Sequence, residues 1–370
     1  MAPATEGCCQ EKRIGADCFP KVEIQENVPL KDWTSLGVGG PARFFVRAKT
    51  QEEILEAVRW ATKRRLPIFV LGGGTNVLFS DRGFDGLVVH MALRGIRRYS
   101  EGEHLIYEVA AGEPWDDFVA QAVEEGAAGV ECLSGIPGTA GATPVQNVGA
   151  YGQETSQTLL DLEVLDLEKG QTRWMKASEC EFGYRRSVFN TVARGRYVIL
   201  RLRFTLVPGG IPTVAYPEVQ HHLRSVGRPL SLREVRKAVL AIRRRKGMLL
   251  ESPQNSYRSA GSFFKNPCLT QEEFCRLAKL CQKEGLGDPP SFPLATGELK
   301  VPAAWLVERA GFCKGHREGR VGISQHHALA LINLGDARAA DLFELKERIE
   351  KAVFDRFGVR LEPEPVLVGW

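Results

Sequence analysis

The sequence predicts an α+β protein (mixed α/β) that is divided into more than one domain, and three observations support this. From Trp33 onward, strand-like and helix-like segments alternate, which is the pattern of mixed α/β domains. The run Pro208-Gly209-Gly210 interrupts the pattern and is the best candidate for a domain boundary. The 370 residues are 44% hydrophobic and 25% charged, as expected for a globular protein of roughly two or three domains.

The elements of the first half follow in chain order. Residues 1–30 show no clear periodicity, so we expect a loosely ordered extension. A strand at 44–46 precedes a helix that begins at a capping box formed by Thr50 and Glu53. The later elements are a strand at 68–71, a helix that begins at Pro114, a glycine-rich segment up to Gly152, and strands from 162 to 206.

The second half reads as a separate α+β unit. Two more capping boxes, Ser231 with Glu234 and Thr270 with Glu273, predict two helices. A further helix starts at Pro302 and stops near residue 311, and a last one covers roughly 339–357 before a short tail.

Composition limits the class of protein. A net charge of +4 and a pI near 8.5 do not argue for nucleic acid binding, although a basic pocket for an anionic substrate remains open. No apolar stretch approaches the ~18 residues of a transmembrane helix, and the first thirty residues lack the apolar core of a signal peptide. We therefore expect a cytoplasmic protein.

Nine cysteines, an odd number without CxxC spacing, favour reduced thiols over disulfides or a zinc site. Cys275 and Cys281 fall on a predicted helix, where buried packing is expected. His326 and His327 lack a third ligand, so no metal site is expected.

Three glycine-rich loops lie in the first half, at 36–41, 72–76 and 135–152. The backbone N–H groups of such loops can converge on a phosphate. None has GxGxxG spacing and neither of the first two leads into a helix, so a Rossmann fold is not expected. Each loop alone fits a structural turn, whereas three in one domain favour a cofactor with a pyrophosphate. In the third loop, the amides of Gln146 and Asn147 could contact a heterocycle.

The run 261–267 (GSFFKNP) places a hydroxyl, an ammonium and an amide around two aromatic rings. In an extended strand, Ser262, Phe264 and Asn266 would face one way, and the intervening residues, including Lys265, would face the other. Such a strand suits the wall of a small-molecule site. An edge strand with one solvated face fits the same pattern.

From about residue 33 to its C-terminus, the sequence resembles the UDP-N-acetylenolpyruvoylglucosamine reductases of peptidoglycan synthesis. The resemblance is carried by the runs 34–40, 71–76, 135–152, 182–185 (FGYR), 261–267 and 361–364 (LEPE). The first three are shared in looser form with flavoproteins similar to vanillyl-alcohol oxidase. The last three are more specific to the reductases.

The resemblance implies a two-part FAD-binding domain of the vanillyl-alcohol-oxidase (PCMH) type, followed by a smaller α+β substrate-binding domain. The implied boundaries are an extension at 1–30, FAD-binding parts at 31–97 and 98–210, a substrate-binding domain at 211–355, and a tail at 356–370 that returns to the active site. The implied cofactor is non-covalent FAD, with NADPH as co-substrate. A monomer that acts on a small molecule is expected, with no nucleic acid or membrane partner.

The implied reaction has two stages. NADPH reduces FAD and leaves. The enolpyruvyl ether of UDP-N-acetylglucosamine then takes a hydride from flavin N5 at its methylene carbon and a proton at the neighbouring carbon, which gives UDP-N-acetylmuramate for peptidoglycan. The cofactor carries the redox chemistry, while the protein positions and polarises the substrate.

Three residues match the catalytic positions of the family. Arg185 would stabilise the negative charge that builds on the substrate carboxylate. Glu364 would share in this as a protonated or proton-sharing acid, because an ionised carboxylate would repel that charge. Ser262 would donate the proton, which requires support from Lys265, Glu364 or a water.

The remaining implied site residues bind the cofactor or the substrate. The FAD candidates are Gly72, Gly73, Gly74, Thr75, Asn76, Gly135, Gly138, Gln146, Asn147, Gly149 and Tyr151. The substrate candidates are Tyr184, Tyr216 on a loop that closes over the substrate, Lys246 and Asn266 near the diphosphate, and His327 near the uridine. The three arginines that precede Lys246, 243–245, are expected on an exposed helix face.

Two other readings remain open. An oxidase of sugars or alcohols would share the FAD loops but not the motifs around Ser262 and Glu364, and it would consume oxygen or bind flavin covalently. A non-catalytic module would bind FAD or a nucleotide sugar without oxidising NADPH when the enolpyruvyl substrate is present.

Overall fold

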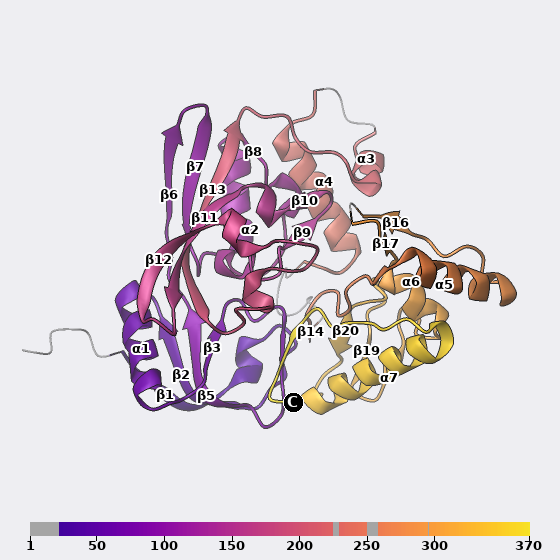
Figure 1. Cartoon of the computed structure of the whole chain (residues 1–370), viewed down its shortest axis with the longest axis horizontal. Coiled ribbons are helices and arrows are strands. Elements are labelled where there is room, and N and C mark those ends of the chain that lie inside the picture. Colours follow the sequence, from indigo (N-terminus) through magenta and orange to yellow (C-terminus); the bar gives the residue numbers. More distant parts are fainter. Residues whose placement is uncertain (1–21, 225–228, 250–257, 295) are drawn as a thin grey trace, which may run out of the picture.

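The computed structural model describes residues 22–224, 229–249, 258–294 and 296–370. Two β-sheets with their helices form one side of the molecule, and a smaller unit rich in helices forms the other (Figure 1). The C-terminal tail runs between these two sides. In the described part of the chain, no helix is both long and apolar enough to cross a membrane.

The first sheet has the strand order β1-β2-β5-β3. Its elements are β1 (Gln25–Pro29), β2 (Pro41–Ala48), α1 (Gln51–Lys63), β3 (Ile68–Leu71) and β5 (Phe84–Met91). Strands β2, β5 and β3 are parallel, as expected for strands joined by a helical crossover. Both halves of the predicted capping box, Thr50 and Glu53, begin α1. Strand β1 lies inside the segment that we expected to be loosely ordered.

The second sheet is antiparallel and has the order β12-β11-β13-β7-β6, with β8 added beside β13. Its strands are β6 (Ile96–Glu101), β7 (His104–Ala110), β8 (Ala127–Ala128), β11 (Leu159–Asp166), β12 (Gln171–Lys176) and β13 (Tyr197–Pro208). Helix α2 (Trp115–Glu124) follows Pro114 as predicted and buries Trp115 and Phe118 against Phe204. A short hairpin, β9 (Gly149–Ala150) with β10 (Gln153–Glu154), closes the glycine-rich segment.

Helices α3 (Pro217–His222) and α4 (Leu232–Arg245) come from the segment expected to belong to the substrate-binding domain. They pack instead on the side of the second sheet, where Val235 and Ile242 of α4 share a core cluster with Cys132 and Tyr151. The core of the C-terminal unit begins only at Ala260 in the second half of the chain.

In its described residues, the C-terminal unit has two small antiparallel sheets and three α-helices. Its sheets are β14 (Arg258–Ser259), β20 (Leu331–Asn333), β19 (Val321–Ile323) and β18 (Arg317–Glu318), and then β15 (Cys268–Leu269), β17 (Leu299–Lys300) and β16 (Phe292–Pro293). Its helices are α5 (Gln271–Lys283), α6 (Ala303–Arg309) and α7 (Ala339–Phe357), all at predicted positions. Asp81 from the first half accepts hydrogen bonds from Ala339 N and Ala340 N, which caps α7.

The tail joins the two sides of the molecule. Its strand β21 (Val366–Val368) pairs in parallel with β4 (Val77–Phe79), which directly follows the glycine loop 72–76. A few residues earlier, Pro363 forms a β-bridge with Phe264. Each end of this short stretch is therefore held by a different side of the molecule.

Short 3-10 helices complete the fold: η1 (Leu30–Trp33), η2 (Glu131–Leu133), η3 (Ala140–Ala142), η4 (Thr155–Gln157), η5 (Ala177–Cys180) and η6 (Val188–Asn190). Of the two cysteines predicted to be buried on α5, Cys281 is buried, whereas Cys275 is exposed because it lies on the outer face of the helix. Residues 1–21, with Cys8, Cys9 and Cys18, lie outside the described residues.

Candidate active site

A cavity of about 570 Å³ lies where the first half, the C-terminal unit and the tail meet. Its wall combines the loop 72–76, parts of the segment 136–149, the segment 259–262 and the tail residues 363–367. Of the FAD candidates, those that line it are Gly72, Gly73, Gly74, Thr75, Asn76, Gln146 and Gly149.

The glycines of the loop 72–76 are required by the closeness of neighbouring atoms. A Cβ on Gly73 would lie 2.8 Å from Gly138 Cα, and one on Gly74, which has φ +65°, would lie 1.9 Å from Trp33 O. There is therefore no room for a side chain where Gly73 meets the loop 135–152 or where Gly74 meets Trp33. This leaves bare backbone at the cavity wall, which fits an elongated cofactor with a pyrophosphate.

The third glycine-rich loop, 135–152, is braced from both sides at Gly135. Gly135 N donates to Asp116 Oδ1 at 2.5 Å, and Gly135 O accepts from Arg243 Nε at 3.0 Å. Arg236 completes the brace as an ion pair with Asp116 at 2.6 Å. The prediction that Arg243 lies on an exposed helix face is wrong, because it faces inward from α4 and lines the cavity at 8% exposure.

Four of the FAD candidates are not among the residues that line the cavity: Gly135, Gly138, Asn147 and Tyr151. The amide of Asn147 is 1% exposed and bonds to Glu154, Gly183 O and Ser156 N, so it holds the loop in shape. Tyr151 is buried, and its ring lies 5.4 Å from that of Tyr216.

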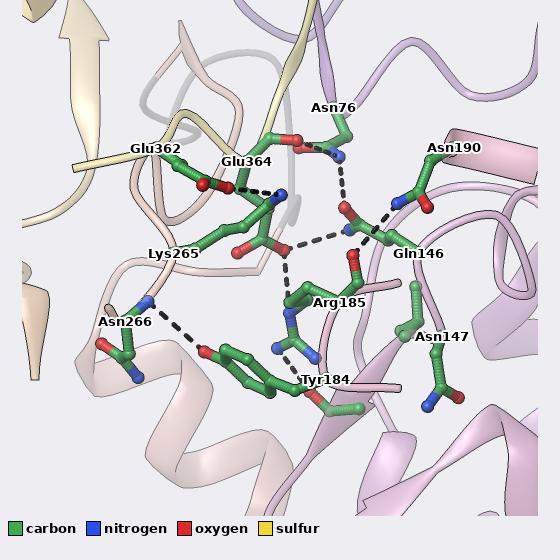
Figure 2. Close-up of polar contacts among 12 residues, drawn as sticks. Asn76, Gln146, Asn147, Tyr184, Arg185, Asn190, Lys265, Asn266, Glu362 and Glu364 are labelled. Carbon is green, nitrogen blue, oxygen red and sulfur yellow. Dashed lines mark hydrogen bonds and ion pairs between the residues drawn. The ribbon is translucent and has the colours of Figure 1, made fainter. Parts of the chain in front are cut away.

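The three catalytic candidates, Ser262, Arg185 and Glu364, all line the cavity. Arg185 Nε lies 3.2 Å from Glu364 Oε1, and its terminal nitrogen donates to Gly149 O at 2.9 Å. Gln146 Nε2 also donates to Glu364 Oε1, at 3.0 Å. Figure 2 shows these contacts converging on one oxygen of the carboxyl.

Glu364 is a partly buried acid, with its side chain 15% exposed, and it has basic neighbours. Burial raises the pKa of its carboxyl, while Arg185, Lys265 and the bond from Gln146 lower it; burial is the largest effect. A carboxyl in this setting can remain protonated at a pH where an exposed glutamate is ionised. It can then act as a hydrogen-bond donor.

The segment 261–267 is not a regular strand, so the predicted alternation of faces is wrong. Gly261 has φ +72°, and within residues 261–267 the one β-bridge joins Phe264 to Pro363 of the tail. As a result, Phe263 and Phe264 are both buried, at 0% and 1% exposure. Lys265, expected to point away, lines the cavity together with Ser262 and pairs with Glu362 at 3.3 Å.

A second cavity, of about 830 Å³, adjoins the first, and Arg185 and Lys265 line both. Tyr184 and Asn266 belong to this second cavity. The backbone N of Asn266 donates to Tyr184 Oη at 3.4 Å (Figure 2). The side-chain oxygen of Asn266 accepts from Ala303 N at 2.9 Å. Asn266 thus also holds the first turn of α6.

The other substrate candidates form a separate group beside Tyr151. Lys246 Nζ lies 2.5 Å from Glu218 Oε2 and 5.7 Å from the centre of the Tyr151 ring. Tyr216 is 44% exposed, immediately before α3. Burial and the charges of Lys246, Lys314 and Arg243 lower the pKa of His327 to about 4. Tyr216, Lys246 and His327 are not among the residues that line the two cavities.

Sequence reasoning missed Arg243 and Asn190 at this site. Asn190 lines both cavities, and its Nδ2 donates to Arg185 O at 3.0 Å, which supports the residue that holds Glu364. The signal for Asn190 was the capping pair with Ser187 at the start of η6. For Arg243 it was the helical spacing of three buried positions on α4, Val235, Val239 and Ile242.

Comparison with known proteins agrees with this architecture. Residues 42–176 match the model of an FAD binding domain, and residues 252–368 match that of the UDP-N-acetylenolpyruvoylglucosamine reductase C-terminal domain. The reductases of Thermobifida fusca and Pseudomonas putida are 45% and 41% identical to the chain, of which they cover 93% and 94%; 97% and 99% of their own lengths align. The crystal structure of the Thermus caldophilus enzyme (MurB) superposes with a TM-score of 0.63 at 28% identity, over 95% of this chain and all of that one.

Glycine loops packed backbone to backbone, an FAD binding domain and a separate α+β unit that completes the cavity define a flavin-dependent oxidoreductase with FAD as cofactor. Within this class, the chain is more than 40% identical to two UDP-N-acetylenolpyruvoylglucosamine reductases over nearly its whole length. The chain belongs to the UDP-N-acetylenolpyruvoylglucosamine reductase family.

Proposed function

We propose that this chain reduces the enolpyruvyl ether of UDP-N-acetylglucosamine to UDP-N-acetylmuramate, with NADPH as the source of electrons and with Ser262, Arg185 and Glu364 as its catalytic residues. The observation that carries this proposal is that these three residues, far apart in the sequence, line one cavity beside the glycine loops. FAD, when bound, would supply to the methylene carbon of the substrate a hydride, whose two electrons come from NADPH.

Residues of the cavity wall hold FAD in this proposal. The loop 72–76 and Gly149 would contact the cofactor through backbone groups, and Thr75, Asn76 and Gln146 through side chains. Gly135, Gly138, Asn147 and Tyr151 would fix the shape of the loops from behind.

Arg185 and Glu364 stabilise the charge that develops on the substrate. Adding electrons at the methylene carbon builds negative charge on the neighbouring carbon and its carboxylate. The Arg185 guanidinium attracts that charge. Glu364 in its protonated form donates a hydrogen bond to it, and the raised pKa of its buried carboxyl supports this form.

Ser262 completes the reaction by transferring its hydroxyl proton to the neighbouring carbon. The oxygen of Ser262 is then negatively charged until it regains a proton from solvent. The ammonium of Lys265, which lines the same cavity, stabilises that charge.

The rest of the substrate extends past Tyr184 toward the α3–α4 side. Lys246 and Asn266 would approach the diphosphate, Tyr216 would close over the substrate, and His327 would contact the uridine as a neutral imidazole, since its pKa is about 4. We also propose a cytoplasmic monomer, because one chain supplies every residue named here.

Anaerobic stopped-flow spectroscopy of the flavin tests this function. NADPH should bleach the absorbance of oxidised FAD, and the enolpyruvyl substrate should restore it in a separate step. A flavin that is reduced but reoxidised only by oxygen or a simple carbohydrate would favour the oxidase. A chain that binds FAD and reacts with neither partner would be a binding module.

A further inference from the structure

Two side-chain amides connect the glycine loop to the candidate catalytic acid. Asn76 Nδ2 donates to the backbone O of Glu364 at 3.2 Å and to Gln146 Oε1 at 3.0 Å. Gln146 Nε2 in turn donates to Glu364 Oε1 at 3.0 Å. Figure 2 shows this chain of contacts running from Asn76 to the carboxyl.

The direction of every hydrogen bond in this chain follows from one atom. A backbone carbonyl can only accept, so Asn76 must present its NH₂ group to Glu364 O. The same NH₂ group meets Gln146, which must therefore present its own carbonyl. The NH₂ group of Gln146 then faces Glu364 Oε1, and that oxygen must accept.

This polarity restricts where a proton can sit on Glu364. Oε1 accepts a hydrogen bond from Gln146 Nε2 and lies 3.2 Å from Arg185 Nε as an ion pair, in which the Nε–H group does not form a hydrogen bond. Neither nitrogen can accept a hydrogen bond, so a proton on Oε1 would lose both contacts. The protonated acid therefore carries its proton on Oε2, which Figure 2 shows on the other side of the carboxyl, away from Gln146.

We propose that Gln146 is a positioning residue: held by Asn76, it fixes which oxygen of Glu364 carries the proton and so aims the acid at the substrate. This rests on the proposed function of Glu364. Because Asn76 ends the loop 72–76, the cofactor loop and the acid share one polar chain. Loss of the Gln146 donor would also destabilise the ionised carboxyl.

The test compares Gln146→Met and Gln146→Glu with an exposed control, Gln171→Glu on β12. Reduction by NADPH should stay unchanged in Gln171→Glu, and in both Gln146 variants it should slow much less than reoxidation does. Reoxidation by the enolpyruvyl substrate should slow by about tenfold or more in both Gln146 variants, as for a lost hydrogen bond to an ionisable group. The alkaline limit of that step should move up by about one pH unit.

Infrared spectroscopy supplies a readout that does not depend on turnover. The C=O band of the protonated carboxyl, assigned by its loss in Glu364→Gln, should persist to a pH about one unit higher in both Gln146 variants. Gln146→Glu keeps the side-chain volume, so it tests the idea even if Gln146→Met folds poorly.

Equal slowing of both half-reactions, or an infrared titration identical to that of the wild type, would overturn the positioning role and leave Gln146 as a cofactor contact. Failure of the wild type to react with the enolpyruvyl substrate would instead contradict the proposed function. In that case the infrared titration would still decide whether Gln146 controls the protonation of Glu364.

Discussion

At the scale of single residues, the site depends on groups whose ordinary acid–base behaviour is altered by their surroundings. Glu364 is partly buried beside basic side chains, and burial raises its pKa. His327 is half-buried near three cations, and burial together with these charges lowers its pKa to about 4. The hydroxyl of Ser262 is by itself a weak acid, so its role as proton donor depends on the groups that line the same cavity.

Replacement of Ser262 by alanine should separate the two half-reactions. Without its hydroxyl, reoxidation by the enolpyruvyl substrate should slow by roughly 10²-fold or more, the contribution of a positioned proton donor. Flavin reduction by NADPH should remain close to that of the wild type. Ser178→Ala, at an exposed position in η5, is the matched control, and stopped-flow absorbance measures both steps.

The low pKa of His327 predicts a pH-dependent stability. The unfolded histidine titrates near 6.5 and the folded one near 4, so the folded state binds the proton less tightly. The stability associated with the neutral imidazole of His327 is fully present above pH 6.5, and it is lost as the pH falls toward 4. On acidification, the unfolding free energy of His327→Gln should therefore fall by up to ~3 kcal/mol less than that of the wild type.

Denaturant unfolding of wild type and His327→Gln at pH 7 and pH 4.5 measures the effect. Their difference in unfolding free energy should shift in favour of the variant at the lower pH. A difference that does not change with pH would rule out the buried neutral imidazole. His104→Gln, at an exposed position, controls for the loss of a histidine alone.

The sequence identified the three catalytic candidates because short motifs encode them, and all three line one cavity. It could not identify how their neighbours are oriented. Lys265 was predicted to point away from the site because a regular strand was assumed, but Gly261 interrupts the segment. Arg243 was predicted to be exposed because all three arginines of the run 243–245 were treated alike, but its side chain is buried.

At the scale of elements, helix starts were predictable because capping boxes are local. The boxes at Thr50, Ser231 and Thr270 all begin helices. Which surface a helix packs on is a tertiary property, and α4 shows the difference. Helix α4 comes after the predicted domain boundary at 208–210 in the sequence. Even so, its Arg243 donates to Gly135 O and braces the glycine-rich loop 135–152 of the first half.

Arg243→Leu should therefore weaken both the fold and FAD binding. It leaves the backbone oxygens of Gly135 and Met248 without their buried donor, which should lower the unfolding free energy by about 2 kcal/mol or more. Arg233→Leu, on the same helix, breaks an exposed pair with Glu124 and should cost about 0–1 kcal/mol. Thermal unfolding and FAD titration distinguish the two.

At the scale of the whole molecule, the tail is the part that unites the two sides. Glu364 lies between the bridge to Phe264 and the pairing of β21 with β4. Beyond it, the Trp370 ring stacks on Phe343 of α7 with centroids 4.0 Å apart. The position of the catalytic acid is thus set by contacts on both sides rather than by its own neighbours in sequence.

Removal of residues 366–370 should test this anchoring, because Glu364 stays in the chain but loses β21. We expect FAD to bind and NADPH to reduce it, while reoxidation by the enolpyruvyl substrate slows by about tenfold or more, as for a displaced catalytic group. Trp370→Phe, which keeps the stacked ring, should retain activity. An unaffected reoxidation rate in the truncated chain would contradict the anchoring.

The contact between Asn76 and Glu364 spans 288 residues of sequence. Closing so long a loop is slow, and contacts of this kind form late when a chain folds. On dilution from denaturant, compaction and tryptophan burial should recover before enzymatic turnover does. The active site of this protein is therefore a reporter of the last step of its own folding.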